Sequence, residues 1–359
     1  MRVAVAGTGA FGRNHLRVYR ELEAAGLGVA LVAAIEPDPV RAAEAAAKFS
    51  IPVFPTVEKL LAADLKLDAA TVAVPTVHHC AVASELLAAG LDLLIEKPLA
   101  ANLGQADELI AQAAKSNRII QPGHLERFNP AVMAVEPKLR RPMFFEAHRL
   151  SVFTPRSLDV DVVLDLMIHD LDIVLTFARS AVREVRAVGL PIVSPNVDIA
   201  NVRVEFESGC VANFTASRVS TETVRKLRFF EPRQYVSIDY ARRDLLVIGI
   251  DTNIPPEIAA AIAAHKLDAA ALAKLAAAAA AAGGPAPGLS FQKPEITLGE
   301  PLRLELESFS KRCARVANRA SRHSKAATRS HSRLKYRRQW PITPSAPGSR
   351  TSSKAASSC

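Results

Sequence analysis

The sequence predicts an α/β protein in which a doubly wound parallel sheet is followed by an α+β domain with a mostly antiparallel sheet. Three observations predict it. Short runs rich in Val, Ile and Leu alternate with amphipathic helical stretches through the first 120 residues, a glycine-rich turn follows the first run, and after about residue 123 the strand-like runs lengthen and are joined by turn residues. With 359 residues, 49% of them hydrophobic, the chain can form two domains.

The first region is predicted to contain five strands with helices between them. The strands are expected at Arg2–Ala6, Ala30–Ile35, Ala69–Val74, Leu91–Ile95 and Arg118–Gln121, and the helices near Gly12–Ala25, Pro39–Lys48, Val77–Ala89 and Leu103–Ser116. Because each helix carries the chain back to the start of the sheet, the strands are expected to run parallel. Residues 1–122 are therefore predicted to form the doubly wound domain.

Residues 123–309 are predicted to form the second domain. Ser208 and Gly209 join two strand-like runs of ANVRVEFESGCVANFTASR as a hairpin, and DVDVVLDLMIHDLDIVLTF reads as one amphipathic helix. Residues 256–282 are so rich in alanine that propensity favours a helix, but their periodicity defines no packing face. A surface helix and an irregular insertion are both open for this segment.

The net charge of +9 is concentrated in the last part of the chain. From Lys311 onward there are 13 Lys and Arg and no Asp or Glu, which leaves 32 basic against 36 acidic residues in residues 1–310. Residues 310–359 are predicted to be a disordered basic tail, and a shifted reading frame after about Phe309 is an alternative origin for it. Since the tail contains no folded nucleic-acid-reading motif, nucleic acid is not an expected partner.

Composition also bears on location and metals. The chain opens directly on a strand pattern, without the features of a signal peptide, and its only long apolar tract is too alanine-rich to insert into a bilayer. A cytoplasmic protein without a membrane partner is expected. Cys80, Cys210, Cys313 and Cys359 are far apart and have no ligand spacing, so reduced thiols and no metal site are predicted.

The glycine-rich turn satisfies G-x-G-x-x-G between a strand and a helix, the context that a dinucleotide-binding motif requires. It comprises Gly7, Thr8, Gly9, Ala10, Phe11 and Gly12. In this motif the first glycine makes the turn, the second lets a pyrophosphate approach the backbone, and the third lets helix and strand pack closely. The N–H groups at the start of the helix then face the phosphates.

Glu36 supplies a second element of a cofactor site. It ends the second predicted strand, 24 residues after Gly12, where a carboxylate can accept hydrogen bonds from a ribose. A carboxylate there repels a 2′-phosphate, so NAD is expected in preference to NADP. The alternative is a solvated glutamate before a turn, but the glycines favour the cofactor.

Two further strand ends carry candidate site residues. LLIEKPLA places Glu96 and Lys97 at the carboxyl end of a strand, where a partly desolvated lysine can exchange protons with a substrate hydroxyl, although a lone lysine there is more often a solvated charge. PTVHHC places Pro75, Thr76 and His79 at another strand end, where they can line the nicotinamide side of the cleft. A helix cap at Thr76 explains that motif nearly as well.

The second domain contributes the remaining candidates. Asp165 and His169 are spaced i, i+4 on one helix face, so the carboxylate can hold the imidazole while it bonds to a substrate; a histidine in a helix-packing contact is the alternative. GHLERFNPAV gathers His124, Glu126, Arg127 and Asn129, and later strands or loops carry Arg149, Arg156, Arg218, Lys226 and Arg228. Clustered arginines suit a diphosphate or carboxylate, and scattered surface arginines remain the alternative.

These residues together resemble the Gfo/Idh/MocA oxidoreductase family. The resemblance is carried by the Gly7 to Gly12 turn, by Glu96-Lys97-Pro98 and by Asp165-x-x-x-His169, in order, from residue 1 to about residue 309. It implies an NAD-binding Rossmann domain followed by a substrate-binding domain whose sheet face mediates contacts in a homodimer or homotetramer. It also implies an NAD(P)-dependent oxidoreductase of CH–OH groups that transfers a hydride between a sugar or polyol carbon and nicotinamide, with Lys97 as acid/base and the other pair on the substrate side.

Within the family, GHLERFNPAV and DLMIHDLDIVL are similar to the branch that acts on UDP-N-acetylhexosamines. This similarity implies oxidation of the 3-hydroxyl of UDP-N-acetylglucosamine to a 3-keto sugar, which an aminotransferase uses on the way to lipid A or surface polysaccharide. The alternatives are a dehydrogenase of another sugar, polyol or amino sugar, and an inactive NAD-binding member. The basic tail departs from the family, whose members usually continue into an amphipathic helix that packs on the nucleotide-binding domain.

Overall fold

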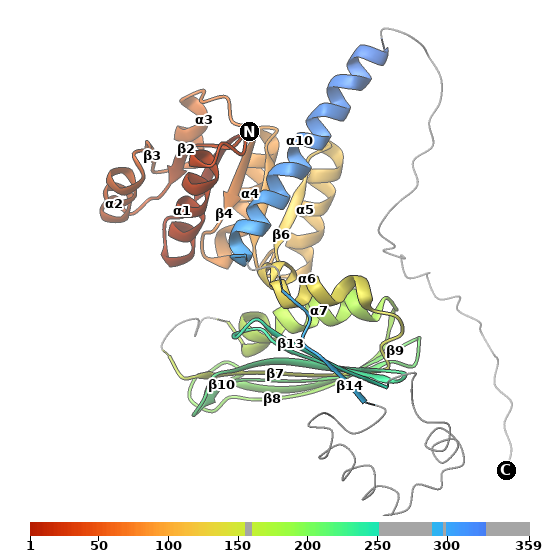
Figure 1. The fold of residues 1–359 in the computed structure, drawn as a ribbon. Coiled ribbons are helices and arrows are strands. Elements are labelled where there is room, and N and C mark those ends of the chain that lie inside the picture. Colours follow the sequence, from red (N-terminus) through yellow and green to blue (C-terminus); the bar gives the residue numbers. More distant parts are fainter. Residues whose placement is uncertain (155–159, 251–288, 297–298, 328–359) are drawn as a thin grey trace, which may run out of the picture. The chain divides into compact units, whose positions relative to one another are not determined.

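The computed structural model describes residues 1–154, 160–250, 289–296 and 299–327 (Figure 1). Arg156, the alanine-rich segment 256–282 and the tail beyond residue 327 lie outside the described residues. In the part of the chain that is described, no helix is long and apolar enough to cross a membrane.

The first sheet has six strands in the order β3-β2-β1-β4-β5-β6, all parallel. Its strands are β1 (Arg2–Ala6), β2 (Ala30–Ile35), β3 (Val53–Phe54), β4 (Ala69–Val72), β5 (Asp92–Glu96) and β6 (Ile120–Gly123). The helices that follow are α1 (Ala10–Ala24), α2 (Pro39–Phe49), α3 (Val57–Ala62), α4 (His79–Ala88) after the 3₁₀ turn Thr76–His78, and α5 (Leu103–Ser116). The predicted doubly wound domain is confirmed, with β3 and α3 as additional short elements.

Helices cover both faces of this sheet because its strands are apolar on both sides. On β1, Val3 and Val5 pack in a cluster with α1 and α2, whereas Ala4 and Ala6 pack in a second cluster with α3, α4 and α5. β3 and α3 were not predicted from the sequence, because a two-residue strand and a six-residue helix are too short to show a hydrophobic repeat.

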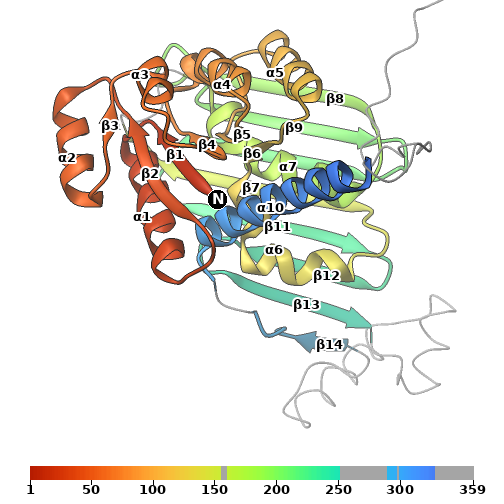
Figure 2. The same ribbon diagram turned by 90° about the horizontal axis from the view of Figure 1, so that it is seen from above.

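The second sheet has eight strands in the order β14-β13-β12-β11-β7-β10-β9-β8 (Figure 2). They are β7 (Phe144–Val152), β8 (Val182–Leu190), β9 (Ile199–Phe206), β10 (Val211–Ser220), β11 (Val224–Glu231), β12 (Gln234–Asp239), β13 (Asp244–Ile250) and β14 (Leu289–Gln292). All pairs are antiparallel except β7 with β10, so the mostly antiparallel sheet is confirmed. The predicted hairpin is the β9–β10 connection, where Gly209 takes a φ of 82°.

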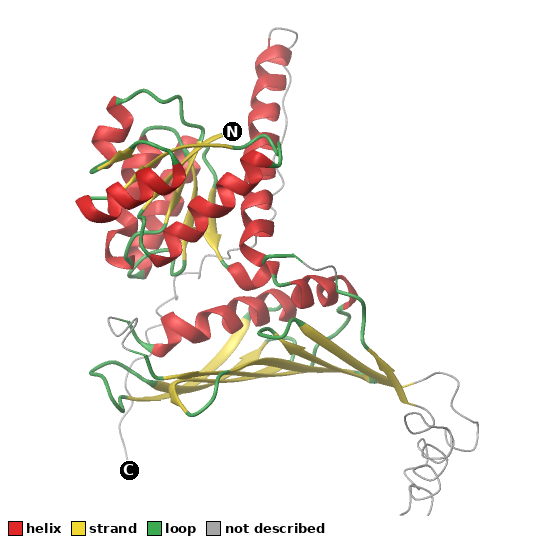
Figure 3. Ribbon diagram, turned by 60° about the vertical axis from the view of Figure 1, so that its left-hand side comes forward, coloured by secondary structure: helices red, strands yellow, loops and turns green. Residues whose placement is uncertain are grey.

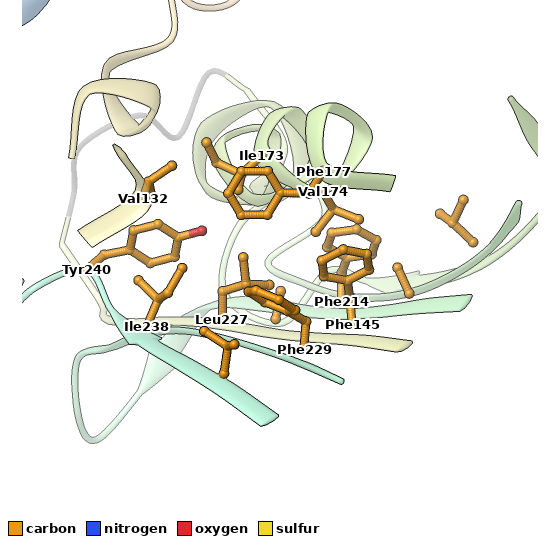
Figure 4. Packing of buried hydrophobic residues seen from close by; sticks show 14 of the residues in the cluster. Val132, Phe145, Ile173, Val174, Phe177, Phe214, Leu227, Phe229, Ile238 and Tyr240 are labelled. Atoms are coloured by element: carbon orange, nitrogen blue, oxygen red, sulfur yellow. The ribbon is translucent and has the colours of Figure 1, made fainter. Parts of the chain in front are cut away.

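Helices cover one face of this sheet, and within the described ranges no helix covers the other, which is called here the uncovered face (Figure 3). The covering helices are α6 (Pro130–Val135), between the 3₁₀ turns Leu125–Phe128 and Glu136–Lys138, and α7 (Ile168–Ala178). Phe177 of α7 meets Phe229 of β11 edge to face, and Phe145 of β7 lies beside the same ring (Figure 4). The helix predicted for the α7 region begins with a π-helical turn, Val163–Met167, which carries Asp165.

The last helix, α10 (Pro301–Ala327), returns to the first domain. Leu302, Leu306, Phe309 and Cys313 are buried in the cluster that contains α1 and α2. The sequence predicts a disordered tail from residue 310, but α10 continues to Ala327, so residues 310–327 are helical. Ala, Arg and Lys are good helix formers, and neither Gly nor Pro occurs between Pro301 and Pro341, so nothing local ends the helix at residue 309.

α10 also buries a carboxyl group, that of Glu305. The side chain is fully buried, and neither carboxyl oxygen has a hydrogen-bond partner in the described structure. Burial, followed by the negative charges of Glu96 and Asp172, raises the pKa of Glu305 well above its usual value of 4.5. The folded chain therefore holds this group protonated.

This arrangement predicts a pH dependence of stability. A group with a raised pKa in the folded state stabilises the fold fully below its unfolded pKa, and that contribution is lost as the pH rises through the folded pKa. Wild type is thus expected to lose stability relative to Glu305→Gln from about pH 5 upward, by at most ~1.4 kcal/mol per pH unit. Urea unfolding of both proteins between about pH 5 and about pH 8 measures the difference, and parallel profiles would contradict the assignment.

Candidate active site

The glycine turn between β1 and α1 has three different steric environments. Gly7 has a φ of +93°, and a Cβ there would lie 2.5 Å from the Ala73 carbonyl oxygen. A Cβ on Gly12 would lie 2.0 Å from the Gly7 carbonyl oxygen, so strand and helix are in direct contact there. A Cβ on Gly9 would have nothing within 4 Å. The turn thus leaves open space beside Gly9 at the N-terminus of α1, where an anion is favoured.

Glu36 lies behind this turn. One carboxylate oxygen accepts hydrogen bonds from the Thr8 backbone N–H at 3.0 Å and from the Thr8 hydroxyl at 2.9 Å. The other accepts from the Asp38 N–H at 3.1 Å and from Arg41 Nη2 at 2.9 Å. Burial raises its pKa, but the hydrogen bonds from Arg41, Thr8 and Asp38 outweigh that effect and lower the pKa to about 2. Glu36 is therefore a fixed negative charge.

The glycine turn and Glu36 line the same cavity, which has a volume of about 530 Å³ and is called here the glycine-loop cavity. Gly7, Gly9, Glu36, Arg41 and Pro75 are among its walls. Its size falls in the range of cofactor and small-ligand sites, roughly 300–1,000 Å³.

A second cavity of about 560 Å³, the lysine cavity, shares Ala73, Val74 and Pro75 with the first and so adjoins it. Its walls come from both domains. The first domain contributes Phe11, Thr76, His79, Glu96, Lys97 and Gly123, and the second contributes Glu126, Arg149, Asp165, Leu166, His169 and Arg225. The carboxyl ends of β4 and β5 thus meet the π-helical turn and α7, as expected for a ligand site in a parallel α/β sheet.

Lys97 reaches across this cavity. Its Nζ donates to the Asp165 backbone carbonyl at 2.7 Å and lies 3.5 Å from Asp165 Oδ1, and about a fifth of the side chain is exposed. The predicted role of Asp165 as the partner of His169 differs from this geometry. No hydrogen bond joins the two side chains in the described structure, and the carboxylate lies against Lys97, because the π-helical turn alters the i, i+4 geometry that a regular helix would give.

His169 is mostly buried, and its Nδ1 has no hydrogen-bond partner among the described residues. Burial, followed by the positive charges of Arg149 and Lys97, lowers the pKa of His169 well below 6.5. The imidazole is therefore neutral at physiological pH, and it can accept or donate a hydrogen bond to a hydroxyl group in the lysine cavity.

Most of the polar residues of GHLERFNPAV bind protein partners. Arg127 forms two 2.6 Å hydrogen bonds with Asp172 on α7, and His124 Nε2 lies 3.8 Å from the same carboxylate. The Asn129 side chain caps α6 and donates to Glu126 and to the Tyr240 carbonyl. Neither Arg127 nor His124 lines a cavity described here. The sequence could not show this, because the acidic partners come from a helix about 45 residues away.

The Arg149 side chain also binds other side chains of the protein. It donates to Asp170 at 2.7 and 3.1 Å and to Glu126 at 3.1 Å, and its guanidinium lies 5.0 Å from the Tyr240 ring centroid. Arg149 forms part of the wall of the lysine cavity, but its guanidinium group already donates hydrogen bonds to these two carboxylates. Arg218 is paired with Asp198 and the Val160 carbonyl, and Arg228 lies near Glu146 on the uncovered face of the sheet, so neither is part of this cavity.

Two residues behind the lysine cavity support its floor. His79 is buried with Nδ1 2.9 Å from the Pro98 carbonyl oxygen and Nε2 2.9 Å from the Val74 carbonyl oxygen, so it ties the ends of β4 and β5 together. Glu96 lies 2.8 Å from Nε2 of the buried His15, and a Cβ on the neighbouring Gly123 would be 3.0 Å from the Glu96 carboxyl. His15 and Glu96 thus position the strand end that carries Lys97.

Sequence analysis missed Arg225 and Arg41. Arg225 lies on β11 beside Leu227 and Phe229, which face the domain core, and a charge on the apolar side of a strand was the available signal. The residues of this strand that the sequence suggested, Lys226 and Arg228, lie on the opposite face. No group of His, Cys, Asp and Glu within the described ranges has the arrangement of a metal site.

Comparison with known proteins identifies two domains. Residues 1–124 match the family described as "Oxidoreductase family, NAD-binding Rossmann fold" (GFO_IDH_MocA), and residues 132–231 match "GFO/IDH/MocA C-terminal domain". UDP-N-acetylglucosamine 3-dehydrogenase of Acidithiobacillus ferrooxidans is 37% identical over 259 residues, which cover 72% of this chain and 80% of that protein. Inositol 2-dehydrogenase of Acidothermus cellulolyticus is 30% identical over 196 residues, or 52% of this chain and 56% of that protein.

Solved structures agree with this comparison. A structure of UDP-N-acetylglucosamine 3-dehydrogenase GnnA from Acidithiobacillus ferrooxidans superposes with a TM-score of 0.73 at 32% identity, covering 88% of this chain and 89% of that one. Levoglucosan dehydrogenase in complex with NADH superposes with a TM-score of 0.72 at 17% identity, over 88% of this chain and 90% of that one, which is a likeness of fold alone.

Proposed function

The chain belongs to the Gfo/Idh/MocA oxidoreductase family, and on that basis we propose that it is an NAD-dependent dehydrogenase that oxidises the 3-hydroxyl of UDP-N-acetylglucosamine to the 3-keto sugar. The observation that carries the reaction class is the position of Lys97. Its Nζ and the neutral His169 lie in the wall of a cavity that adjoins the glycine-loop cavity.

The residues of the glycine-loop cavity fit a dinucleotide. The open space beside Gly9 suits a pyrophosphate, and the ionised Glu36 suits ribose hydroxyls. Because both Glu36 oxygens already accept two hydrogen bonds, a ribose must replace one donor, and the half-exposed Arg41 is the one that can move. Pro75 and Thr76 then lie toward the nicotinamide end, where the two cavities adjoin. Nicotinamide supplies the hydride acceptor when it is bound.

Lys97 and His169 have separable roles in the proposed reaction. Oxidation of a carbinol leaves a carbonyl only if the hydroxyl proton also leaves, and Lys97 Nζ takes that proton as the neutral amine and becomes the ammonium ion. Asp165 holds Lys97 in place through its backbone carbonyl at 2.7 Å. The neutral imidazole of His169 donates its N–H to the oxygen of the same hydroxyl and so orients it.

The open space beside Gly9 leads to a first prediction, which concerns the binding of NAD. Gly9→Ala is expected to weaken NAD binding at least ~10-fold, because the methyl group occupies the space that a pyrophosphate requires. Gly9 has a φ of −63°, which alanine tolerates, so stability is expected to change by no more than about 0.5 kcal/mol. Titration calorimetry with NAD and a thermal melt of the same variant measure both effects. Unchanged NAD affinity with unchanged stability would contradict the placement.

Preference for NAD over NADP is assigned to the fixed charge of Glu36. Glu36→Ser removes the negative charge and frees Arg41 for a 2′-phosphate. The ratio of kcat/KM for NADP to that for NAD is expected to rise by about 10–100-fold, which corresponds to ~1.4–2.8 kcal/mol. Arg41→Ala in the same background is the matched control and is expected to reverse the gain. An unchanged ratio in Glu36→Ser would remove this account of specificity.

The substrate is assigned by similarity to the 37% identical relative, whose printed activity is on UDP-N-acetylglucosamine. The second candidate is a polyol, since inositol 2-dehydrogenases are 30% identical over about half of the chain. Initial rates of NADH formation with UDP-N-acetylglucosamine, myo-inositol and free N-acetylglucosamine separate them. The nucleotide sugar is expected to give the highest kcat/KM, and preferential oxidation of inositol would overturn the substrate assignment.

Further parts of the proposal concern assembly and location. The uncovered face of the second sheet carries an aromatic group in which Phe230 lies 5.8 Å from Phe144 and 5.1 Å from Tyr235 between ring centroids. On the same face, the edge strand β8 exposes Val188 and Leu190. This face suits a second copy of the chain, and sedimentation velocity tests for the dimer or tetramer.

The cytoplasm is proposed as the location because NAD and nucleotide sugars occur there. A 3-keto sugar is a suitable substrate for an aminotransferase. The 3-amino sugar that this enzyme forms would then be used in lipid A biosynthesis.

A further inference from the structure

A third cavity, of about 360 Å³, adjoins the lysine cavity. The two cavities share Phe11, Leu125, Glu126 and Arg225 in their walls. Beyond them, the third cavity is lined by Arg17 and Arg243, and it is called here the arginine cavity. The mechanism above uses none of these arginines.

The charges of the arginine cavity do not balance. Arg17 is paired with Glu21 and Glu300, and Glu126 is paired with Arg149. Arg243 donates only a long 3.4 Å hydrogen bond to the Gly299 carbonyl. Within the described ranges, no acidic side chain pairs with Arg243 or with the Arg225 guanidinium. Two positive charges therefore face one cavity without a negative partner.

Arg225 lies between the arginine cavity and the lysine cavity, where Lys97 and His169 are. It stands opposite Arg149 in the β11–β7 ladder, and its side chain lines both cavities. Its charge also contributes to the lowered pKa of His169, after burial and nearer cations. A ligand that fills the lysine cavity can thus extend past Arg225 into the arginine cavity.

We propose that Arg225 and Arg243 form an anion subsite that binds the diphosphate of the substrate while its sugar ring occupies the lysine cavity. The inference rests on the proposed function and deepens it. Guanidinium forks match phosphate oxygens in geometry and charge, and two unpaired arginines match the two negative charges that a diphosphate diester carries. A free sugar or a polyol has no group that pairs with them.

Binding of UDP and of inorganic pyrophosphate to the NAD-saturated chain tests the subsite, because NAD then blocks the seat beside Gly9. In the double variant Arg225→Gln/Arg243→Gln, both probes are expected to bind at least ~10-fold more weakly by titration calorimetry, with NAD affinity unchanged. Arg242→Gln is the matched control, since Arg242 lies in the same turn and does not line the cavity. It is expected to bind both probes like wild type.

The outcomes separate the subsite from the proposed function. Equal UDP affinity in the double variant and wild type, or no binding of either probe by wild type, overturns the subsite. Turnover of UDP-N-acetylglucosamine with an unchanged KM in the double variant also overturns it while leaving the proposed function intact. Binding of UDP or pyrophosphate that depends on the two arginines, without turnover of UDP-N-acetylglucosamine, supports the subsite and overturns the substrate assignment.

Discussion

Replacement of Lys97 by alanine is expected to lower kcat by about 10²–10⁴-fold while NAD affinity stays within about twofold of wild type. The loss follows from the position of Nζ, which reaches into the lysine cavity and is held at 2.7 Å by the Asp165 carbonyl. Removing it leaves the substrate hydroxyl without a proton acceptor. Stopped-flow measurement of NADH formation, with a parallel NAD titration, separates the chemical step from cofactor binding.

Two further variants sharpen this test. Lys97→Arg keeps the positive charge, but a guanidinium does not give up its proton, so it is expected to be nearly as slow as the alanine variant. Lys66→Ala is the control, because Lys66 is exposed, pairs with Asp64 and does not line the lysine cavity. Retention of more than about a tenth of the wild-type rate in Lys97→Ala would show that another group takes the proton.

The largest expected effect on stability comes from α10. Phe309→Ala is expected to lower the free energy of unfolding by about 3–5 kcal/mol, because the ring is fully buried against α1 and α2 and its loss leaves a cavity. Urea unfolding monitored by circular dichroism measures it. Ser310→Ala, one residue later on the same helix, is the control and is expected to change stability by no more than about 0.5 kcal/mol. A cost for Phe309→Ala below about 1 kcal/mol would mean that α10 contributes little to the fold.

This helix also bears on the origin of the basic tail. Leu302, Leu306 and Phe309 precede the change of composition, and Cys313 is a buried position that follows it. Up to residue 315, where the burial of α10 is described, most of its buried apolar side chains therefore come before the change. Intact-mass measurement of the protein from its native source tests the shifted reading frame, which would be ruled out if the 359-residue product is the species present.

Much of the fold was predictable because it follows from local periodicity. The strands at Arg2–Ala6 and Ala30–Ile35 and the helix at Leu103–Ser116 have the predicted bounds. The parallel pairing of β7 with β10 was not predictable, because it joins strands separated by about 60 residues and no local signal specifies a partner. The continuation of α10 was obscured by a change of composition that did not remove helix propensity.

The candidate site was predictable where a backbone motif defines it. The steric roles assigned to Gly7, Gly9 and Gly12 follow from the motif alone, and the geometry of the turn has the corresponding close contacts and open space. Side-chain pairing was not predictable, since Arg127 and Arg149 find acidic partners on α7 only in the folded chain. The same limitation hid Arg225, for which the described residues provide no acidic partner.

The measurement that tests the central claim most directly follows a deuterium atom from the substrate to the cofactor. UDP-N-acetylglucosamine carrying deuterium at C3 is incubated with NAD and the purified chain, and the NADH formed is analysed by mass spectrometry. If the 3-hydroxyl is oxidised by hydride transfer, the reduced cofactor gains one deuterium, and Lys97→Ala produces almost none. NADH without deuterium would show that another carbon is oxidised, and the absence of NADH from a chain that still binds NAD and UDP-N-acetylglucosamine would contradict the proposed reaction.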